Sequence, residues 1–156
     1  METRINLLEK GSGAMKAMQG LGIYLAKSPV EETLLHLIEY RVSQINGCAY
    51  CLDMHSKDLR AEGETEQRIY TISAWREAPF YTKRERAALA WAEAVNNIEN
   101  GQISDEVYEE ARAEFSEQEL IDITVAVTTV SAYNRFNIAF RPEVGTYKAG
   151  MFKARA

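Results

Sequence analysis

The sequence lacks the features that would place the protein in a membrane or on nucleic acid. Its longest apolar-leaning run without a charge covers residues 123–134 and is shorter than the roughly 20 residues that span a bilayer. The N-terminal METRINLLEK has no apolar segment of the kind that a signal peptide needs. The formal net charge is −5, so no basic excess serves nucleic acid or an anionic membrane surface. We therefore expect a soluble, cytoplasmic protein without nucleic-acid or membrane partners.

The chain also lacks internal repeats, low-complexity tracts and any linker long enough to separate domains. Its apolar fraction of 46% and charged fraction of 26% are those of an ordinary globular protein. We expect a single domain over residues 1–156, with residues 1–11 and 146–156 as peripheral tails.

Helix-capping signals divide the chain into a series of helices. A capping box pairs a Ser or Thr with a Glu three residues later, which satisfies free N–H groups of the first turn. Such boxes occur at Ser28–Glu31, Thr82–Glu85 and Ser116–Glu119. Pro29 fits a first helical position, and Gly47, Gly63 and Gly101 are expected to end helices. The predicted all-α chain has about seven helices, at 13–27, 29–45, 48–62, 65–75, 83–98, 104–114 and 117–139.

The segment 117–139 carries two competing patterns. β-Branched residues alternate with other residues as in a strand, at Ile121, Ile123, Val125 and Val127. A helical stripe fits equally, through Leu120, Ile123, Val127 and Val130, and a capping box precedes it. We favour the helix.

Rare residues cluster between positions 48 and 55. This stretch contains both cysteines of the chain, Cys48 and Cys51, and one of its two histidines, His55. On a helix advancing about 100° per residue, these three side chains lie within about 60° of one another. Asp53 and Lys57 lie on the other side, at the spacing of an exposed ion pair. The thiols and the imidazole are therefore predicted to face the interior or a cleft.

This arrangement favours dithiol redox chemistry. Two cysteines three residues apart can close a disulfide, and a helix N-terminus together with a neighbouring imidazolium stabilises a thiolate. A reactive thiolate beside a second thiol is what peroxide reduction or disulfide exchange requires. Three other interpretations remain open. They are a buried apolar pair with a core histidine, a zinc site with Cys, Cys and His ligands, and a purely regulatory thiol switch.

The cysteine segment resembles a known family. INGCAYCLDMHSKDLR is similar to the signature of the carboxymuconolactone decarboxylase-like superfamily, in its alkyl hydroperoxidase AhpD-like branch. The resemblance extends to Glu64–Val95 and Ser131–Gly145, and covers most of the chain from about residue 12 to 147. It implies an all-α fold with a helical-hairpin core, and a helix for residues 117–139. It also implies homo-oligomers, usually trimers or hexamers.

The resemblance implies a peroxidase-type site made by Cys48, Cys51 and His55. One thiolate is oxidised to a sulfenate, the other resolves it as a disulfide, and an external dithiol or protein reductant recycles the pair. We predict that His55 activates Cys51, that hydroperoxide oxidises this thiol, and that Cys48 resolves the sulfenate. The family's relay glutamate, twelve residues before the first cysteine, is His36 here. Either His36 or Glu39, one turn on, replaces it, or His36 is a surface histidine and the relay is missing.

The predicted activity is a thiol-dependent, peroxiredoxin-type hydroperoxide reductase with an antioxidant role. It requires no flavin, haem or metal. The alternatives are a redox-sensing oligomer and a lyase like the decarboxylases that name the superfamily, which generally lack the CxxC pair. The aromatic residues Trp75, Phe80, Tyr81 and Trp91 are read as core or interface rather than as a substrate pocket.

Overall fold

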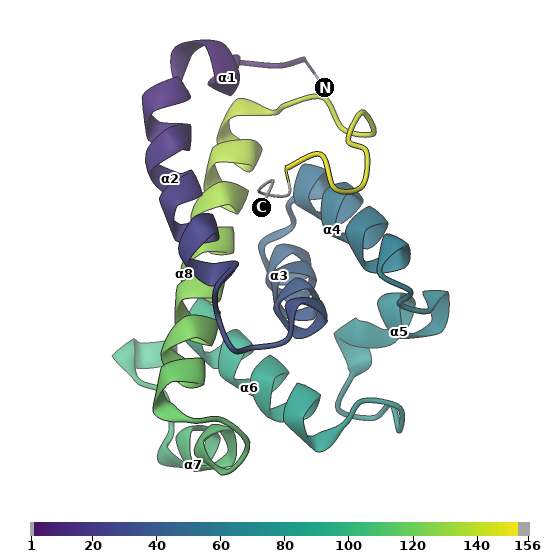
Figure 1. Ribbon diagram of the computed structural model, residues 1–156, viewed down its shortest axis with the longest axis vertical. Helices are drawn as coiled ribbons and strands as arrows, with labels where there is room; N and C mark the ends of the chain where they lie inside the picture. Colours follow the sequence, from purple (N-terminus) through teal and green to yellow (C-terminus); the bar gives the residue numbers. More distant parts are fainter. Residues whose placement is uncertain (1, 153–156) are drawn as a thin grey trace.

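The structure, a computed structural model, describes residues 2–152. Within that range it consists of α-helices, two short 3₁₀ turns and loops, which confirms the all-α prediction (Figure 1). The α-helices are α1 (Leu7–Lys10), α2 (Ser12–Leu25), α3 (Glu32–Asn46), α4 (Ala49–Ala61), α5 (Glu66–Thr71), α6 (Lys83–Asn97), α7 (Asp105–Glu114) and α8 (Glu117–Phe140). The 3₁₀ turns are Ile72–Ala74 and Glu99–Gly101. The short helix α1, inside the predicted N-terminal tail, is the α-helix that the sequence did not predict.

Helix α3 lies at the centre of the molecule, where it packs against α4, α6 and α8 (Figure 1). It forms an antiparallel hairpin with α4, as the contact of Glu39 with His55 and that of His36 with Glu62 show. Gly47 makes this tight reversal possible, because its φ of 70° lies in the left-handed region that glycine adopts without a Cβ penalty. The predicted helical-hairpin core is therefore present, and its turn leads directly into Cys48.

Two of the three predicted capping boxes form, those at the starts of α6 and α8. The third is wrong, because the Ser28 hydroxyl donates instead to the carboxylate of Asp122 on α8. Tyr24 and Gln118 donate to the same buried carboxylate, and hydrogen bonds to a buried charge are strong. Helix α3 consequently begins at Glu32, and Pro29 lies in the preceding loop.

Two other predicted boundaries also change. Helix α6 ends at Asn97, with Ile98 in the left-handed conformation as its C-cap, so Gly101 ends only the 3₁₀ turn that follows. Helix α2 ends at Leu25, two residues before the predicted boundary.

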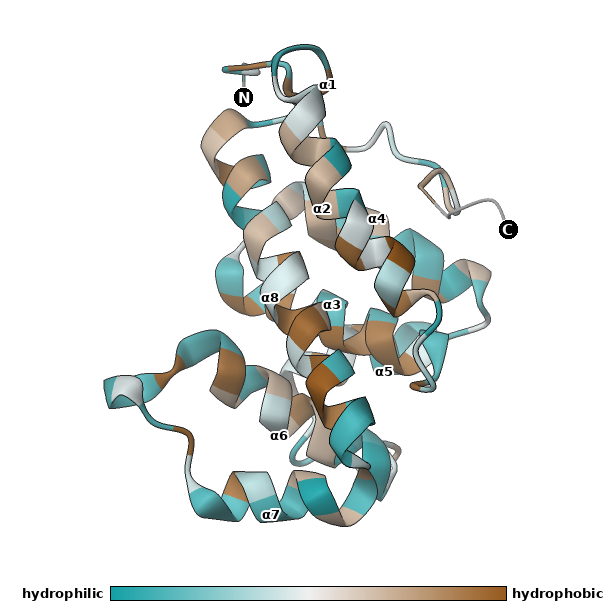
Figure 2. Cartoon of the chain, turned by 60° about the vertical axis from the view of Figure 1, so that its left-hand side comes forward, coloured by the Kyte–Doolittle hydropathy of each residue, from teal (hydrophilic) through white to brown (hydrophobic). Residues whose placement is uncertain are grey.

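The segment with two competing patterns is the long helix α8. Its side chains Ile123 and Val127 are almost fully buried, whereas 56% of Ile121 is exposed. A strand would have placed these three residues on one face. The periodicity is therefore helical, and the buried stripe packs in one core with residues of α3 and α6. In Figure 2, brown apolar segments mark α3 where it lies among the other helices.

A second core lies between α3, α4, α6 and the segment that follows α5. It holds Trp75 and Tyr81, while Trp91 belongs to the first core and Phe80 is partly buried against the second. The interpretation of these aromatics as core residues is confirmed. Their polar atoms are satisfied internally, since Trp75 donates to Glu93 and Trp91 to Thr124.

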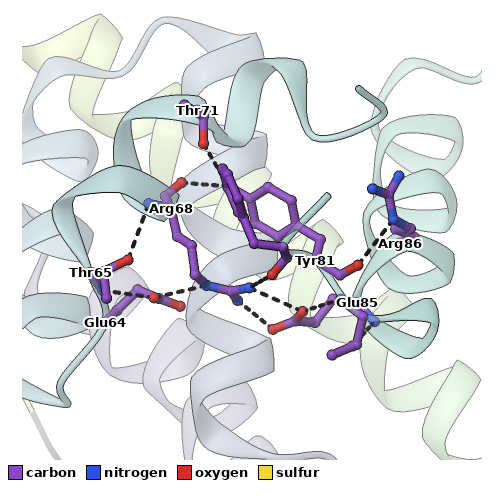
Figure 3. A network of polar contacts seen from close by, with 9 residues as sticks. Glu64, Thr65, Arg68, Thr71, Tyr81, Glu85 and Arg86 are labelled. Carbon is purple, nitrogen blue, oxygen red and sulfur yellow. Dashed lines mark hydrogen bonds and ion pairs between the residues drawn. The ribbon is translucent and has the colours of Figure 1, made fainter. Parts of the chain in front are cut away.

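A charged network closes the end of this second core (Figure 3). The guanidinium of Arg68 on α5 lies between the carboxylates of Glu64 and Glu85 and also donates to the carbonyl oxygen of Phe80. The Tyr81 hydroxyl returns a hydrogen bond to the Arg68 carbonyl oxygen. These contacts join Glu64, which follows the end of α4, to α5, to the loop after it and to the first turn of α6.

The C-terminal segment is more closely attached than a peripheral tail. Only 4% of Tyr147 is exposed, and its hydroxyl donates to both oxygens of Asp58 on α4 at 2.9 Å. The neighbouring Lys57 donates to the carbonyl oxygens of Gly145 and Tyr147. For Tyr147 the prediction of a peripheral tail was wrong. Nowhere in residues 2–152 is a helix both long and apolar enough to cross a bilayer.

Candidate active site

Both cysteines lie at the start of α4 and are joined by a disulfide, with their Cα atoms 5.3 Å apart. Cys48 is the N-cap residue, and its Sγ accepts a hydrogen bond from the backbone N–H of Cys51 at 3.3 Å. The side chain of Cys48 therefore takes the place of a Ser or Asp cap, where the free N–H groups and the helix dipole favour negative charge. The same position favours a thiolate once the disulfide is reduced.

The predicted helical wheel is confirmed. Cys48 and Cys51 are each 1% exposed and His55 is 6% exposed, so the stripe faces the interior. On the other side of α4, Lys57 and Asp53 form an ion pair at 2.7 Å. The i, i+3 and i, i+4 spacings were sufficient to predict which side chains of α4 face the interior, because the helix itself formed as expected.

Glu39 is the acidic residue that reaches His55. Its Oε2 lies 3.5 Å from Nδ1 of His55, across the α3–α4 hairpin, and 19% of its side chain is exposed. His36, which occupies the family's glutamate position, makes its contact elsewhere. Its Nδ1 is 2.8 Å from Oε2 of Glu62, and its ring centroid is 6.5 Å from that of His55. The structure thus places Glu39 beside the Cys–His stripe and His36 at its margin.

Burial sets the charges of this pair. It raises the pKa of the Glu39 carboxyl to about 7, helped by the carboxylates of Asp58, Glu62 and Glu32 and opposed by the imidazole of His36. Burial also lowers the pKa of His55 to about 3, and His36 adds to the decrease. His55 is therefore neutral at pH 7. This applies to the disulfide form, in which no thiolate is present to hold a proton on the ring, and the neutral ring offers a nitrogen that can accept one.

A possible metal-binding group lies beside this stripe. One imidazole nitrogen of His36 and one carboxylate oxygen each from Glu32 and Glu62 lie within 4.8 Å of one another. Such a nitrogen and oxygen set suits a divalent transition metal. His36 and Glu62 already bond each other, however, and we assign no ion here. The alternative zinc site at Cys48, Cys51 and His55 needs two thiolates, which the disulfide state does not provide.

Asn137 is a residue of this site that the sequence did not indicate. It lies near the end of α8, and its Nδ2 donates to Sγ of Cys51 at 3.3 Å. Asn137 belongs to the segment 131–145, whose family resemblance was evident. Its 86-residue separation from Cys51 meant that no spacing rule connected it with the thiols.

Comparison with known proteins agrees with this geometry. The sequence pattern described as "Carboxymuconolactone decarboxylase family" matches residues 13–94, which include both cysteines, His36, Glu39 and His55. The uncharacterised protein YdfG of Bacillus subtilis is 39% identical over 139 residues, covering 89% of this chain and 95% of YdfG.

Two further proteins bear on the AhpD-like branch. Alkyl hydroperoxide reductase AhpD of Streptomyces coelicolor is 37% identical over 92 residues, which are 56% of this chain and 51% of that protein. A crystal structure from Agrobacterium tumefaciens superposes with a TM-score of 0.88 at 42% identity, covering 94% of this chain and all of that one. That protein is of unknown function and is provisionally described as an antioxidant defence protein AhpD.

Proposed function

The chain belongs to the carboxymuconolactone decarboxylase family, in its AhpD-like branch, and on that premise we propose that it reduces hydroperoxides through the Cys48–Cys51 disulfide. The observation that carries the proposal is the redox pair itself. Two thiols that close a disulfide at a helix N-terminus lie on one buried stripe with a neutral imidazole, which a carboxyl group contacts from the neighbouring helix.

The proposed reaction begins with removal of the Cys51 proton. Above pH 7 the ionised carboxylate of Glu39 accepts the Nδ1–H of His55, which leaves Nε2 free to take the proton of the thiol one turn earlier. The Cys51 thiolate attacks the hydroperoxide, forming Cys51–SOH and releasing an alkoxide that takes up a proton. Glu39 thereby replaces the family's relay glutamate from the next turn of α3. His36, at the margin of the site, lowers the pKa of both Glu39 and His55.

Cys48 completes the oxidative half of the cycle. Its thiolate, stabilised at the N-cap, attacks the sulfenate sulfur, so that a disulfide forms and hydroxide leaves as water after protonation. An external dithiol, either a protein or a small molecule, returns two electrons by thiol–disulfide exchange. Because each cysteine is only 1% exposed, this exchange requires movement of the first turn of α4 or of the segments that cover it.

We also propose that the chain assembles as a homo-oligomer, a trimer or a hexamer. Helix α2 supports this proposal, because it exposes large apolar side chains at Leu21, Ile23 and Tyr24. Size-exclusion chromatography with light scattering tests it, and a monomer at micromolar concentration would contradict it.

Single-thiol variants test the reaction. Cys48→Ser should consume about one equivalent of cumene hydroperoxide and accumulate a sulfenate that dimedone traps at Cys51, because the resolving thiol is gone. Cys51→Ser should consume none. Tyr50→Phe, a change on the same turn at a residue without an assigned role, serves as the control and should turn over normally with dithiothreitol as reductant. Unchanged turnover in Cys51→Ser would overturn the proposal.

A further inference from the structure

Each sulfur of the disulfide accepts a hydrogen bond from a different source. The backbone N–H of Cys51 donates to Cys48 Sγ, which is the ordinary consequence of an N-cap position. The donor to Cys51 Sγ is the side-chain amide of Asn137, at 3.3 Å. Nothing in the geometry of α4 requires this second bond, because its donor comes from α8.

The amide of Asn137 is held in position by the packing of α8. One turn earlier, Asn134 is fully buried, where it accepts from Asn46 at 2.9 Å and donates to Ser43 at 3.0 Å. These bonds attach the last part of α8 to α3 immediately before the turn that leads to Cys48. A donor carried on such an anchored segment is preorganised, so it needs little rearrangement when charge develops on the sulfur.

The site needs a donor of this kind because its other polar groups provide little positive charge. In the disulfide form, from which reduction releases the Cys51 thiolate, His55 is neutral, and the cations that follow on α4 are engaged elsewhere. Lys57 pairs with Asp53, and Arg60 pairs with Glu66. A neutral N–H donor stabilises a buried thiolate without introducing a second buried charge.

We propose that Asn137 is a catalytic residue that stabilises the Cys51 thiolate by donating its amide N–H to Sγ. The inference rests on the proposed hydroperoxide reduction and adds a residue to it. The same bond serves two steps of the cycle. It supports the thiolate that attacks the hydroperoxide, and it supports the thiolate released when an external thiol attacks Cys48 and breaks the disulfide. Both steps place a full negative charge on Cys51 Sγ.

The thiol pKa of Cys51 tests the proposal directly. In a Cys48→Ser background only Cys51 can be alkylated, so the pH dependence of iodoacetamide labelling reports its thiolate. A hydrogen bond to a charged group contributes about 1.5–3 kcal/mol, or about one to two pH units. Asn137→Leu should therefore raise the thiol pKa by about one unit or more. Asn137→Asp, nearly isosteric, should raise it further because a carboxylate disfavours the thiolate.

Gln118→Leu is the matched control, since it removes an amide donor at the opposite end of α8. It should lower the thermal midpoint and leave the thiol pKa unchanged, because it removes bonds to Tyr24 and Asp122 rather than a bond to sulfur or to the anchor of Asn137. A thiol pKa equal to that of the parent in Asn137→Asp would overturn the inference, whatever the stability of the Leu variant.

Failure of the two proposals can be told apart. A shifted thiol pKa in a protein that does not consume hydroperoxide retains the role of Asn137 at the thiolate and rejects hydroperoxide reduction. Normal hydroperoxide consumption with an unshifted thiol pKa retains hydroperoxide reduction and rejects the role of Asn137 at the thiolate.

Discussion

Glu39 offers the sharpest test of the proton path. Its pKa of about 7 means that it titrates across the range in which the enzyme would work. By simple titration the ionised fraction is about 9% at pH 6 and about 91% at pH 8. If only ionised Glu39 holds the Nδ1–H of His55, the rate of Cys51 oxidation should rise about tenfold between these two pH values. The rate should fall as the pH drops through 7, because protonated Glu39 cannot accept that proton.

Replacement by an amide separates this effect from titration of the thiol. Glu39→Gln cannot take up a proton, so we expect the rate of Cys51 oxidation to decrease by about 10²–10⁴. Any remaining pH dependence should follow the thiol alone, as measured by alkylation. The assay is a single turnover of reduced protein with limiting cumene hydroperoxide, quenched and scored for disulfide.

Glu31→Gln is the matched control for this experiment. It removes a carboxylate just before the first residue of α3, where Glu31 pairs with Arg84 away from His55. Its pH profile should match that of the wild type. Should Glu39→Gln retain both the wild-type rate and the step near pH 7, the proposed relay would be refuted.

Three further predictions concern stability and can be measured by urea unfolding. Tyr147→Phe leaves the buried Asp58 carboxyl without its hydroxyl donor and should lower the free energy of unfolding by about 1–3 kcal/mol, whereas an unchanged value would mean that the C-terminal segment does not hold α4. Burial opposes ionisation of Asp122, but its three side-chain donors outweigh this and lower its pKa. Its contribution should therefore be complete above the unfolded pKa near 3.8 and disappear as the pH falls through the lower folded value, and Asp122→Ala should remove that dependence. Ile123→Ala should cost about 2–5 kcal/mol and the exposed Ile121→Ala less than about 0.5 kcal/mol, while equal costs would contradict the helical register of α8.

The features that could be predicted from the sequence share a local origin. The capping boxes at Thr82 and Ser116 formed because each hydrogen-bonding partner lies three residues away. The inward stripe of cysteines and histidine follows from helical spacing within two turns. The all-α class needed only such local signals, together with a family resemblance that resolved the ambiguous segment of α8.

The errors arose where a distant residue competed with a local one. Ser28 had a suitable cap partner in Glu31, but the carboxylate of Asp122, 94 residues away, takes its hydroxyl. The burial that lowers the pKa of His55 was likewise not visible from the sequence, because desolvation depends on what covers the ring and not on its neighbours in sequence.

By itself, then, the sequence determined the helices, the redox pair and the face on which that pair lies, since backbone hydrogen bonding and side-chain periodicity act over a few residues. Only the tertiary structure decided which carboxyl group contacts His55. His36 and Glu39 lie on the same helix, and the crossing of α3 with α4 brings Glu39 to His55 and His36 to Glu62. The packing of α8 likewise brings Asn137 to Cys51. Contacts between helices depend on packing geometry, which residue spacing along a single helix does not predict.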